Sequence, residues 1–438
     1  MSEDKIIISF DNEKPRKKED KILIDLDEKI KVPAKDIDDK NELKEKVQIK
    51  GNTAKEKISS EINTKELKIN SNFRENPALT GFSSSDMSFP SGVENGFGET
   101  FTSNIKDVFL NSLLVNNLYL IASSKSGNVY FIDRNDGEIF DKIFFENESF
   151  EKTGFIFQNI SYINSLKSIY KFERTESNGN ITKQIIYTSG DENFIWSNLN
   201  YYDGNIAFVE YSPATKIAFL KIIDIDKHKI KYEYKFEVKN NIYDSVIIGN
   251  KTFFVLFDNK ILIIDLSNQT NKIVNINFNA SPDLFILYLN HKLYFNNTED
   301  DLLYLDMEHF TGKVKFSGIS SSIINSLSGI GENIVIGNSN GWEIYKSNGT
   351  LLYKFEDTSD NKIETLNTNI IAISKQNRIV FHNLNRFQEA EGFTLSSNLD
   401  STINDNIASV KISFDSIFVL TKKGILKAYK NDKLNVMV

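Results

Sequence analysis

The chain has 438 residues, no cysteine and a formal net charge of −8. The lack of cysteine excludes disulfides, thiolate metal sites, a cysteine nucleophile and a lipoprotein anchor from these residues. The acidic balance argues against general nucleic-acid binding, which depends on a dense basic surface. No apolar run approaches the roughly 18 residues that span a bilayer. The run before Asp11 is too short for a signal peptide, so we expect a cytoplasmic protein without membrane insertion.

Residues 1–75 differ in composition from the rest of the chain. Residues 1–78 contain 18 basic and 18 acidic residues, but only two of the 52 aromatic residues, Phe10 and Phe73. Such a segment cannot bury enough apolar area to offset the entropy lost on ordering. We therefore expect residues 1–75 to form a disordered, charged arm.

Two short β-prone motifs interrupt this arm. Lys5–Asp11 (KIIISFD) and Lys21–Asp27 (KILIDLD) are near copies that begin sixteen residues apart. A segment of this kind can bind by adding a strand to the sheet edge of a partner. The alternative is that the motifs have no role or fold back on the main domain. The candidate partner-binding residues in the motifs are Ile6, Ile8, Phe10, Ile22, Ile24 and Leu26.

Residues 76–102 are rich in Ser, Gly and Phe, and they separate the arm from the main domain. This composition is typical of a flexible linker. The four aromatic rings are unusual for a spacer, so the segment is interpreted as a linker or as a strap that lies on the main domain. The rings belong to Phe82, Phe89, Phe97 and Phe101.

A unit of strands and tight turns recurs through residues 103–438. In Asn117–Phe140, the apolar runs Leu118–Ala122 and Val129–Asp133 are separated by a short turn, and Asp136-Gly137 fits a second turn. The equivalent strand ends fall at residues 133, 224, 265, 306, 345, 383 and 429, with spacings of 91, 41, 41, 39, 38 and 46. The doubled first gap predicts a degenerate copy, which Ile160–Ser189 fits.

A period near 40 residues with about four short strands per unit is typical of a β-propeller blade. One blade cannot bury both of its faces, whereas a closed ring buries a continuous core and hides most sheet edges. We therefore predict an all-β protein whose residues 103–438 form a propeller of seven or eight four-stranded blades. An open β-solenoid or two stacked sandwiches is the alternative architecture.

The repeats resemble those of pyrroloquinoline-quinone-type (quinoprotein-like) propellers. In that family a strand ends in Asp and is followed, after two or three residues, by Thr-Gly, Lys or Glu and an aromatic residue. The matching segments are Tyr130–Phe140 (YFIDRNDGEIF), Tyr304–Asp306 with Thr311–Phe316 (TGKVKF), and Ile344-Tyr345 with Asn348-Gly349 and Phe355. Family members usually carry Trp at the positions of Phe140, Phe316 and Phe355.

The resemblance implies either of two kinds of function. Quinoprotein dehydrogenases use a calcium-bound quinone, an Asp base and a vicinal Cys pair, whereas the propeller of the outer-membrane assembly machinery binds proteins without catalysis. This chain has no cysteine, and no acidic constellation of the family can be placed on its residues. We therefore expect the non-catalytic branch, with no catalytic residue, no cofactor and no metal site.

Other residues favour structural interpretations. Asp133–Gly137 could suggest a calcium loop, but Gly137 is fifth rather than sixth and Phe144 stands where the loop needs Glu, so a hairpin turn is predicted. The two tryptophans, Trp196 and Trp342, are expected in the core, with a contact surface at a propeller face as the alternative.

The sequence thus predicts a protein-binding scaffold whose arm is a possible docking segment. Its alternatives are a quinoprotein-like or carbohydrate-active propeller enzyme and a structural component of a larger particle such as a virion. Loops at the ends of the ring would supply the binding residues. Among them Asp300 and Asp301 are expected to attract a basic or polar protein partner.

Overall fold

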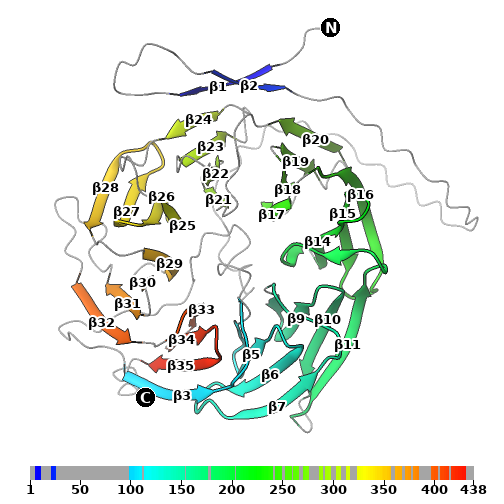
Figure 1. Ribbon diagram of the computed structural model, residues 1–438, viewed down its shortest axis with the longest axis vertical. Helices are drawn as coiled ribbons and strands as arrows, with labels where there is room; N and C mark the ends of the chain where they lie inside the picture. Colours follow the sequence, from blue (N-terminus) through cyan, green and yellow to red (C-terminus); the bar gives the residue numbers. More distant parts are fainter. Residues whose placement is uncertain are drawn as a thin grey trace, which may run out of the picture.

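The computed structural model describes residues 5–10, 21–25 and 98–430, the last range with gaps that include 276–285, 316–322 and 384–395. Every regular element in the described residues is a β-strand. Apart from the hairpin formed by the first two strands, these strands make up eight sheets, which Figure 1 shows arranged around a ring. We number the sheets in chain order.

The first four sheets run consecutively along the chain, and all their neighbouring strands pair antiparallel. The first two are β4 (Leu113–Val115), β5 (Tyr119–Ser123), β6 (Asn128–Asp133) and β7 (Ile139–Phe144), then β8 (Phe155–Phe157), β9 (Ile160–Asn164), β10 (Ser168–Arg174) and β11 (Ile181–Thr188). The next two are β12 (Phe194–Ile195), β13 (Asn200–Tyr202), β14 (Asn205–Ser212), β15 (Ile217–Asp224) and β16 (Ile230–Glu237), then β17 (Ile242–Ile248), β18 (Thr252–Phe257), β19 (Lys260–Asp265) and β20 (Thr270–Asn275).

The fifth to seventh sheets repeat this four-stranded meander, with the last strand of each at the rim of the ring (Figure 1). They are β21 (Ile286–Leu289), β22 (Lys292–Asn296), β23 (Leu302–Asp306) and β24 (Gly312–Lys315), then β25 (Ile324–Ile330), β26 (Asn333–Asn338), β27 (Gly341–Lys346) and β28 (Leu351–Glu356), then β29 (Asn361–Leu366), β30 (Ile370–Lys375), β31 (Arg378–Asn383) and β32 (Ser396–Thr402).

The eighth sheet joins the two ends of the main domain. Its order is β3 (Gly98–Asn104), β35 (Ile425–Lys430), β34 (Ser416–Thr421) and β33 (Ile407–Ser413). The first described strand of the ring thus begins at Gly98, inside the segment 76–102 that was expected to be a linker or strap. The sequence of β3 does not show this, because Phe101 is the only buried residue among its seven.

The core lies between neighbouring sheets. The rings of Phe131 in the first sheet and Phe172 in the second meet edge to face at 5.5 Å. Middle strands such as β14 are buried along their whole length because sheets cover both of their faces. Outer strands such as β16 alternate between exposed and covered positions. This difference explains why the middle strands read as continuous apolar runs in the sequence.

The turn between β6 and β7 also links the first and eighth sheets. The carboxylates of Asp133 and Asp136 each accept a hydrogen bond from the backbone N–H two residues ahead, at 2.8 Å. Gly137 takes the positive φ of 75° that favours glycine. The predicted hairpin turn is therefore confirmed, and within it Arg134 Nη2 donates to the carbonyl of Ser413 at 2.9 Å.

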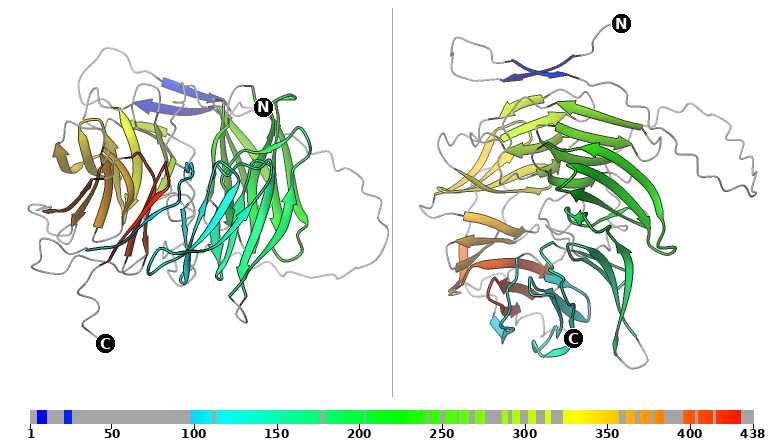
Figure 2. Two further views of the ribbon diagram at one scale, coloured as in Figure 1. Left: turned by 60° about the horizontal axis from the view of Figure 1, so that its bottom comes forward. Right: turned by 45° about the vertical axis from the view of Figure 1, so that its right-hand side comes forward.

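The two motifs of the N-terminal arm form a hairpin outside the ring. β1 (Lys5–Phe10) and β2 (Lys21–Asp25) pair antiparallel, and β1 also pairs with the outer strand of the fifth sheet, β24. The fifth sheet thereby becomes six-stranded, in the order β2-β1-β24-β23-β22-β21. Both views in Figure 2 show the hairpin lying against the rim of the ring.

Candidate functional site

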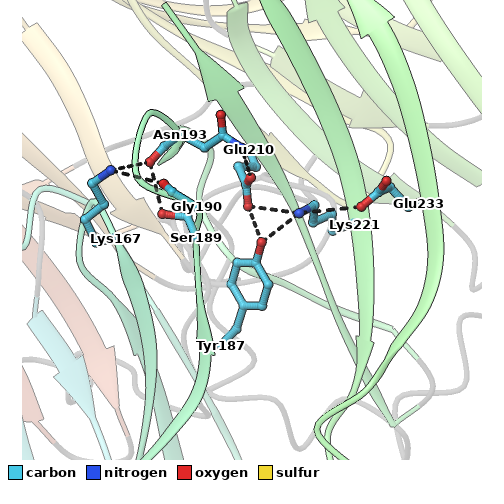
Figure 3. A network of polar contacts seen from close by, with 8 residues as sticks. All are labelled: Lys167, Tyr187, Ser189, Gly190, Asn193, Glu210, Lys221 and Glu233. Atoms are coloured by element: carbon cyan, nitrogen blue, oxygen red, sulfur yellow. Dashed lines mark hydrogen bonds and ion pairs between the residues drawn. The ribbon is translucent and has the colours of Figure 1, made fainter.

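A cluster of charged and polar side chains lies between the second and third sheets (Figure 3). Tyr187 comes from β11, Glu210 from β14, Lys221 from β15 and Glu233 from β16. The strand register brings them together, because Lys221 lies directly opposite Glu233 and Glu210 is diagonal to Lys221 across the β14–β15 ladder. The cluster is therefore built by sheet geometry rather than by loops.

Each ionic group in this cluster has specific partners. Lys221 Nζ lies 3.2 Å from Glu210 Oε2 and 3.5 Å from Glu233 Oε2, and it donates to the Tyr187 hydroxyl at 2.7 Å. The Tyr187 hydroxyl in turn donates to Glu210 Oε2. The other Glu210 oxygen accepts from Asn193 Nδ2 at 2.5 Å. The ammonium thus has one hydrogen-bond partner and two carboxylates beside it, and both Glu210 oxygens accept hydrogen bonds.

Because the charges of Glu210 and Lys221 are buried, each needs a partner inside the protein. Glu210 is 0% exposed and the Lys221 side chain only 10% exposed, so both charges are largely shielded from water. Burial, followed by the hydrogen bond to Glu210, raises the pKa of the Tyr187 hydroxyl, which keeps it protonated as a donor. A buried cluster whose members are joined by hydrogen bonds and ion pairs can hold two sheets in register.

A second cation fixes the position of Asn193. Lys167 Nζ, from the turn between β9 and β10, donates to the carbonyls of Gly190 (3.3 Å), Asp191 (2.7 Å) and Asn193 (2.7 Å). It also lies 4.1 Å from the centre of the Phe194 ring. The chain that connects the two sheets is therefore tied to the second sheet by Lys167 and to the third by the side chain of Asn193.

Carboxylates recur in the segments that connect neighbouring sheets. Asp107 binds the β5–β6 hairpin, Glu148 binds β10, and Asp405 binds the β34–β35 hairpin. The residue after each carboxylate accepts a backbone hydrogen bond from the next sheet. These bonds run from Lys125 to Val108 (2.8 Å), from Leu166 to Ser149 (3.1 Å) and from Lys422 to Asn406 (2.7 Å). We call Asp107, Glu148 and Asp405 the linker carboxylates, and their repetition indicates an architectural role.

The folded structure stabilises the ionised form of Asp107, one of the linker carboxylates. Burial alone would raise its pKa, but hydrogen bonds from Ser126, Asn128, Ser124 and Tyr130 outweigh burial and lower the pKa to about 2. The Ser126 and Tyr130 hydroxyls donate at 2.7 and 2.8 Å. The folded state thus favours the carboxylate over the acid.

Replacing Asp107 with asparagine should lower the free energy of unfolding by about 1 kcal/mol at pH 7, since partial exposure screens the interaction. Because the folded pKa is depressed, this stability is present above about pH 4 and is lost as the pH falls toward 2. Urea unfolding at pH 7 and pH 3 measures the effect, and the difference between variant and wild type should shrink at pH 3. Asp226→Asn, at an exposed site, is the control. A pH-independent difference would contradict the assignment.

The structure places five of the sequence-predicted binding residues in the hairpin of the arm. Its register sets Ile6 opposite Ile24 and Ile8 opposite Ile22 in the β1–β2 ladder, and Phe10 opposite Val314 of β24. Three further predicted residues, Leu26, Asp300 and Asp301, lie outside the described residues. The structure therefore brings the arm motifs together at a sheet edge of their own chain.

Sequence reasoning missed the charged cluster, although a signal for it exists. Glu210 and Lys221 each interrupt an otherwise apolar strand, NIAFVEYS and IAFLKIID. A charge inside a strand that is buried on both faces needs a partner, and the two hairpin strands could have been paired on that basis. Trp196 was expected in the core, but it is 38% exposed, whereas Trp342 is fully buried.

In the parts of the chain that the structure describes, no three His, Asp or Glu side chains are grouped so as to hold a metal ion. The same residues include no helix long and apolar enough to cross a membrane.

The chain matches no protein-family model and no curated protein. Solved structures do resemble it. The computationally designed Ika8 protein has a TM-score of 0.58 at 10% identity, over 76% of this chain and 99% of that one. BamB from Moraxella catarrhalis has a TM-score of 0.53 at 10% identity, over 76% and 99%. Quinohemoprotein alcohol dehydrogenase ADHIIG from Pseudomonas putida HK5 has a TM-score of 0.57 at 7% identity, over 82% and 79%.

These likenesses define the class of fold. An all-β chain of mostly four-stranded antiparallel sheets, with BamB and a quinohemoprotein dehydrogenase among its structural neighbours, has a propeller-like fold. At 7–10% identity the likeness concerns the fold alone, and the same fold serves an enzyme in one neighbour.

Proposed function

We propose that the protein is a non-catalytic scaffold that binds other proteins, built on a propeller in which each of the eight described sheets is one blade. The observation that carries this proposal is the pairing of β1 with β24, since it places an extended segment on the edge of a blade. Strand addition of this kind is a common mode of peptide recognition. The buried ion pair of Glu210 with Lys221 and the hydrogen bonds around it also favour a structural role for the charged cluster.

The alternative function is that of a quinoprotein-like or carbohydrate-active propeller enzyme. The likeness in fold to a quinohemoprotein alcohol dehydrogenase favours it. Purified full-length protein, supplied with quinone and calcium, should give no turnover of alcohols or sugars if the scaffold proposal is right. Turnover that scales with protein concentration would contradict the scaffold proposal and support the enzyme alternative.

The scaffold proposal predicts a specific partner. Immobilised full-length chain should enrich the same protein in repeated pull-downs from the lysate of its own source. That protein, once purified, should bind the full-length chain in solution by calorimetry. The same chain after heat denaturation serves as the control for binding to the folded protein. Enrichment of nothing beyond the control, or binding equal to that of the denatured chain, would contradict the proposal.

A further inference from the structure

The edge of β24 differs from every other described rim strand, because another segment of the chain pairs with it. Ser9 lies opposite Lys313 and Phe10 opposite Val314, in a parallel arrangement, whereas the sheets of the ring are antiparallel throughout their described ladders. β2 lies beside β20, the outer strand of the preceding sheet. The hairpin thus covers the rim where the fourth and fifth sheets meet (Figure 2).

We propose that the outer edge of β24 is a strand-addition site for a partner segment that has an aliphatic run followed by an acidic residue. The arm of this chain caps the site in cis through residues 5–10. This inference rests on the proposed scaffold function and names the chemistry of its partner. Binding of the partner requires that its strand replaces β1 on β24.

The chemistry of β24 supports this choice of partner. A rim strand presents unpaired backbone N–H and C=O groups that an added strand satisfies. The sequence of β24, Gly312–Lys315, carries two lysines and no acidic residue. Both arm motifs follow their aliphatic run with aspartate, Asp11 in one and Asp25 in the other. The lysines of β24 and the aspartates of the arm motifs carry opposite charges. This difference favours pairing between the two segments and disfavours a basic competing segment.

The geometry of the cap favours exchange. The register of β1 with β24 includes only two residue pairs, so the cap is held by few backbone hydrogen bonds. The 72 residues between Asp25 and Gly98 reach at most about 260 Å when fully extended. This length is ample for the arm hairpin to reach β24 from β3, although β3 and β24 lie on opposite sides of the ring (Figure 1). A tethered segment acts at an effective concentration of about 1 mM, so it excludes weak competitors while a stronger or more concentrated strand displaces it.

The experiment compares three full-length proteins, using a fluorescent synthetic peptide of residues 3–13 as the probe. In the released-arm variant, Ile7→Pro and Leu23→Pro remove ladder donors from both strands of the hairpin. In its matched control, Ile7→Val and Leu23→Val keep strand-forming residues at the same two positions. Fluorescence anisotropy should show at least tenfold tighter binding of the probe to the released-arm variant than to wild type or the control. Equal binding to all three, or no binding to the released-arm variant, would overturn the proposal.

Two further variants test where and how the probe binds. A probe with Ser9→Pro should lose binding, because proline cannot donate to the ladder. Lys313→Glu with Lys315→Glu, added to the released-arm variant, should weaken binding at least fivefold at low salt while circular dichroism remains unchanged. Unchanged binding in either test would overturn the edge of β24 as the site. A concentration-dependent dimer of wild type that is absent from the released-arm variant would show arm exchange between copies and overturn capping in cis.

The two proposals can fail separately. If the probe does not bind but the purified partner does, the scaffold function stands and the strand-addition site is wrong. If the probe binds the released-arm variant but no protein partner is found, the site stands without the scaffold function.

Discussion

Replacing Lys221 with methionine should lower the free energy of unfolding by about 3–5 kcal/mol, which is a large part of the stability of an ordinary domain. The substitution leaves the Glu210 carboxylate, which is 0% exposed, without its ammonium partner. A buried charge that has lost its partner cannot recover its hydration in the folded state. Urea unfolding at pH 7, followed by circular dichroism, measures the loss.

Two companion variants test this interpretation. Glu233→Gln removes the partner whose side chain is 45% exposed, so it should cost no more than about 1 kcal/mol. Changing Glu210 and Lys221 together to methionine should recover most of the loss, since apolar residues of similar volume often replace a buried ion pair at little cost. A Lys221→Met loss below 1 kcal/mol, or a double variant that is less stable than the single one, would contradict the buried-pair account.

Replacing Phe101 with alanine should lower the free energy of unfolding by about 3 kcal/mol. Phe101 lies in β3, is 9% exposed, and belongs to the core cluster that joins the eighth sheet to the first. Its ring also lies against the β6–β7 turn, where a Cβ on Gly137 would clash with it. Urea unfolding checks the value.

The neighbouring Thr102 is the matched control for Phe101. Thr102 is exposed and its hydroxyl donates to Glu99 on the same strand, so Thr102→Ala should change the free energy of unfolding by no more than about 0.5 kcal/mol. If Phe101→Ala costs as little as Thr102→Ala, then β3 does not contribute to the core and the eighth sheet is not completed as described.

Alternating apolar runs and Asp-Gly turns were sufficient to predict most of the fold. The runs at 118–122 and 129–133 became β5 and β6, and Ile160–Ser189, predicted to hold a degenerate copy, supplies β9, β10 and β11. β3 could not be predicted in the same way. Its partner β35 lies at the other end of the chain, and a single buried phenylalanine carries no periodicity. Strands selected by a distant partner show little of that partner in their own sequence.

The candidate site was less accessible to sequence reasoning than the fold. The sequence analysis predicted acidic loop residues such as Asp300 as binding residues, because loops often carry function. The charged cluster lies within strands instead. The motifs Lys5–Asp11 and Lys21–Asp27 could be identified as strand-forming from their composition, but the choice of a sheet edge depends on which edges the ring leaves open. That choice is a property of the assembled tertiary structure, which local patterns do not contain.

The pairing of β3 with β35 has a consequence for biosynthesis. Thr100 donates to the carbonyl of Ala428, which lies 328 residues further along the chain. At roughly 5–20 residues per second, a ribosome needs about 15–65 s to complete that stretch. During this interval β3 has left the ribosome with no strand to pair with, while the sheets between fold in turn. The ring can close only after β35 has been translated, so a nascent chain that stalls before residue 425 keeps Phe101 exposed and open to chaperones and proteases.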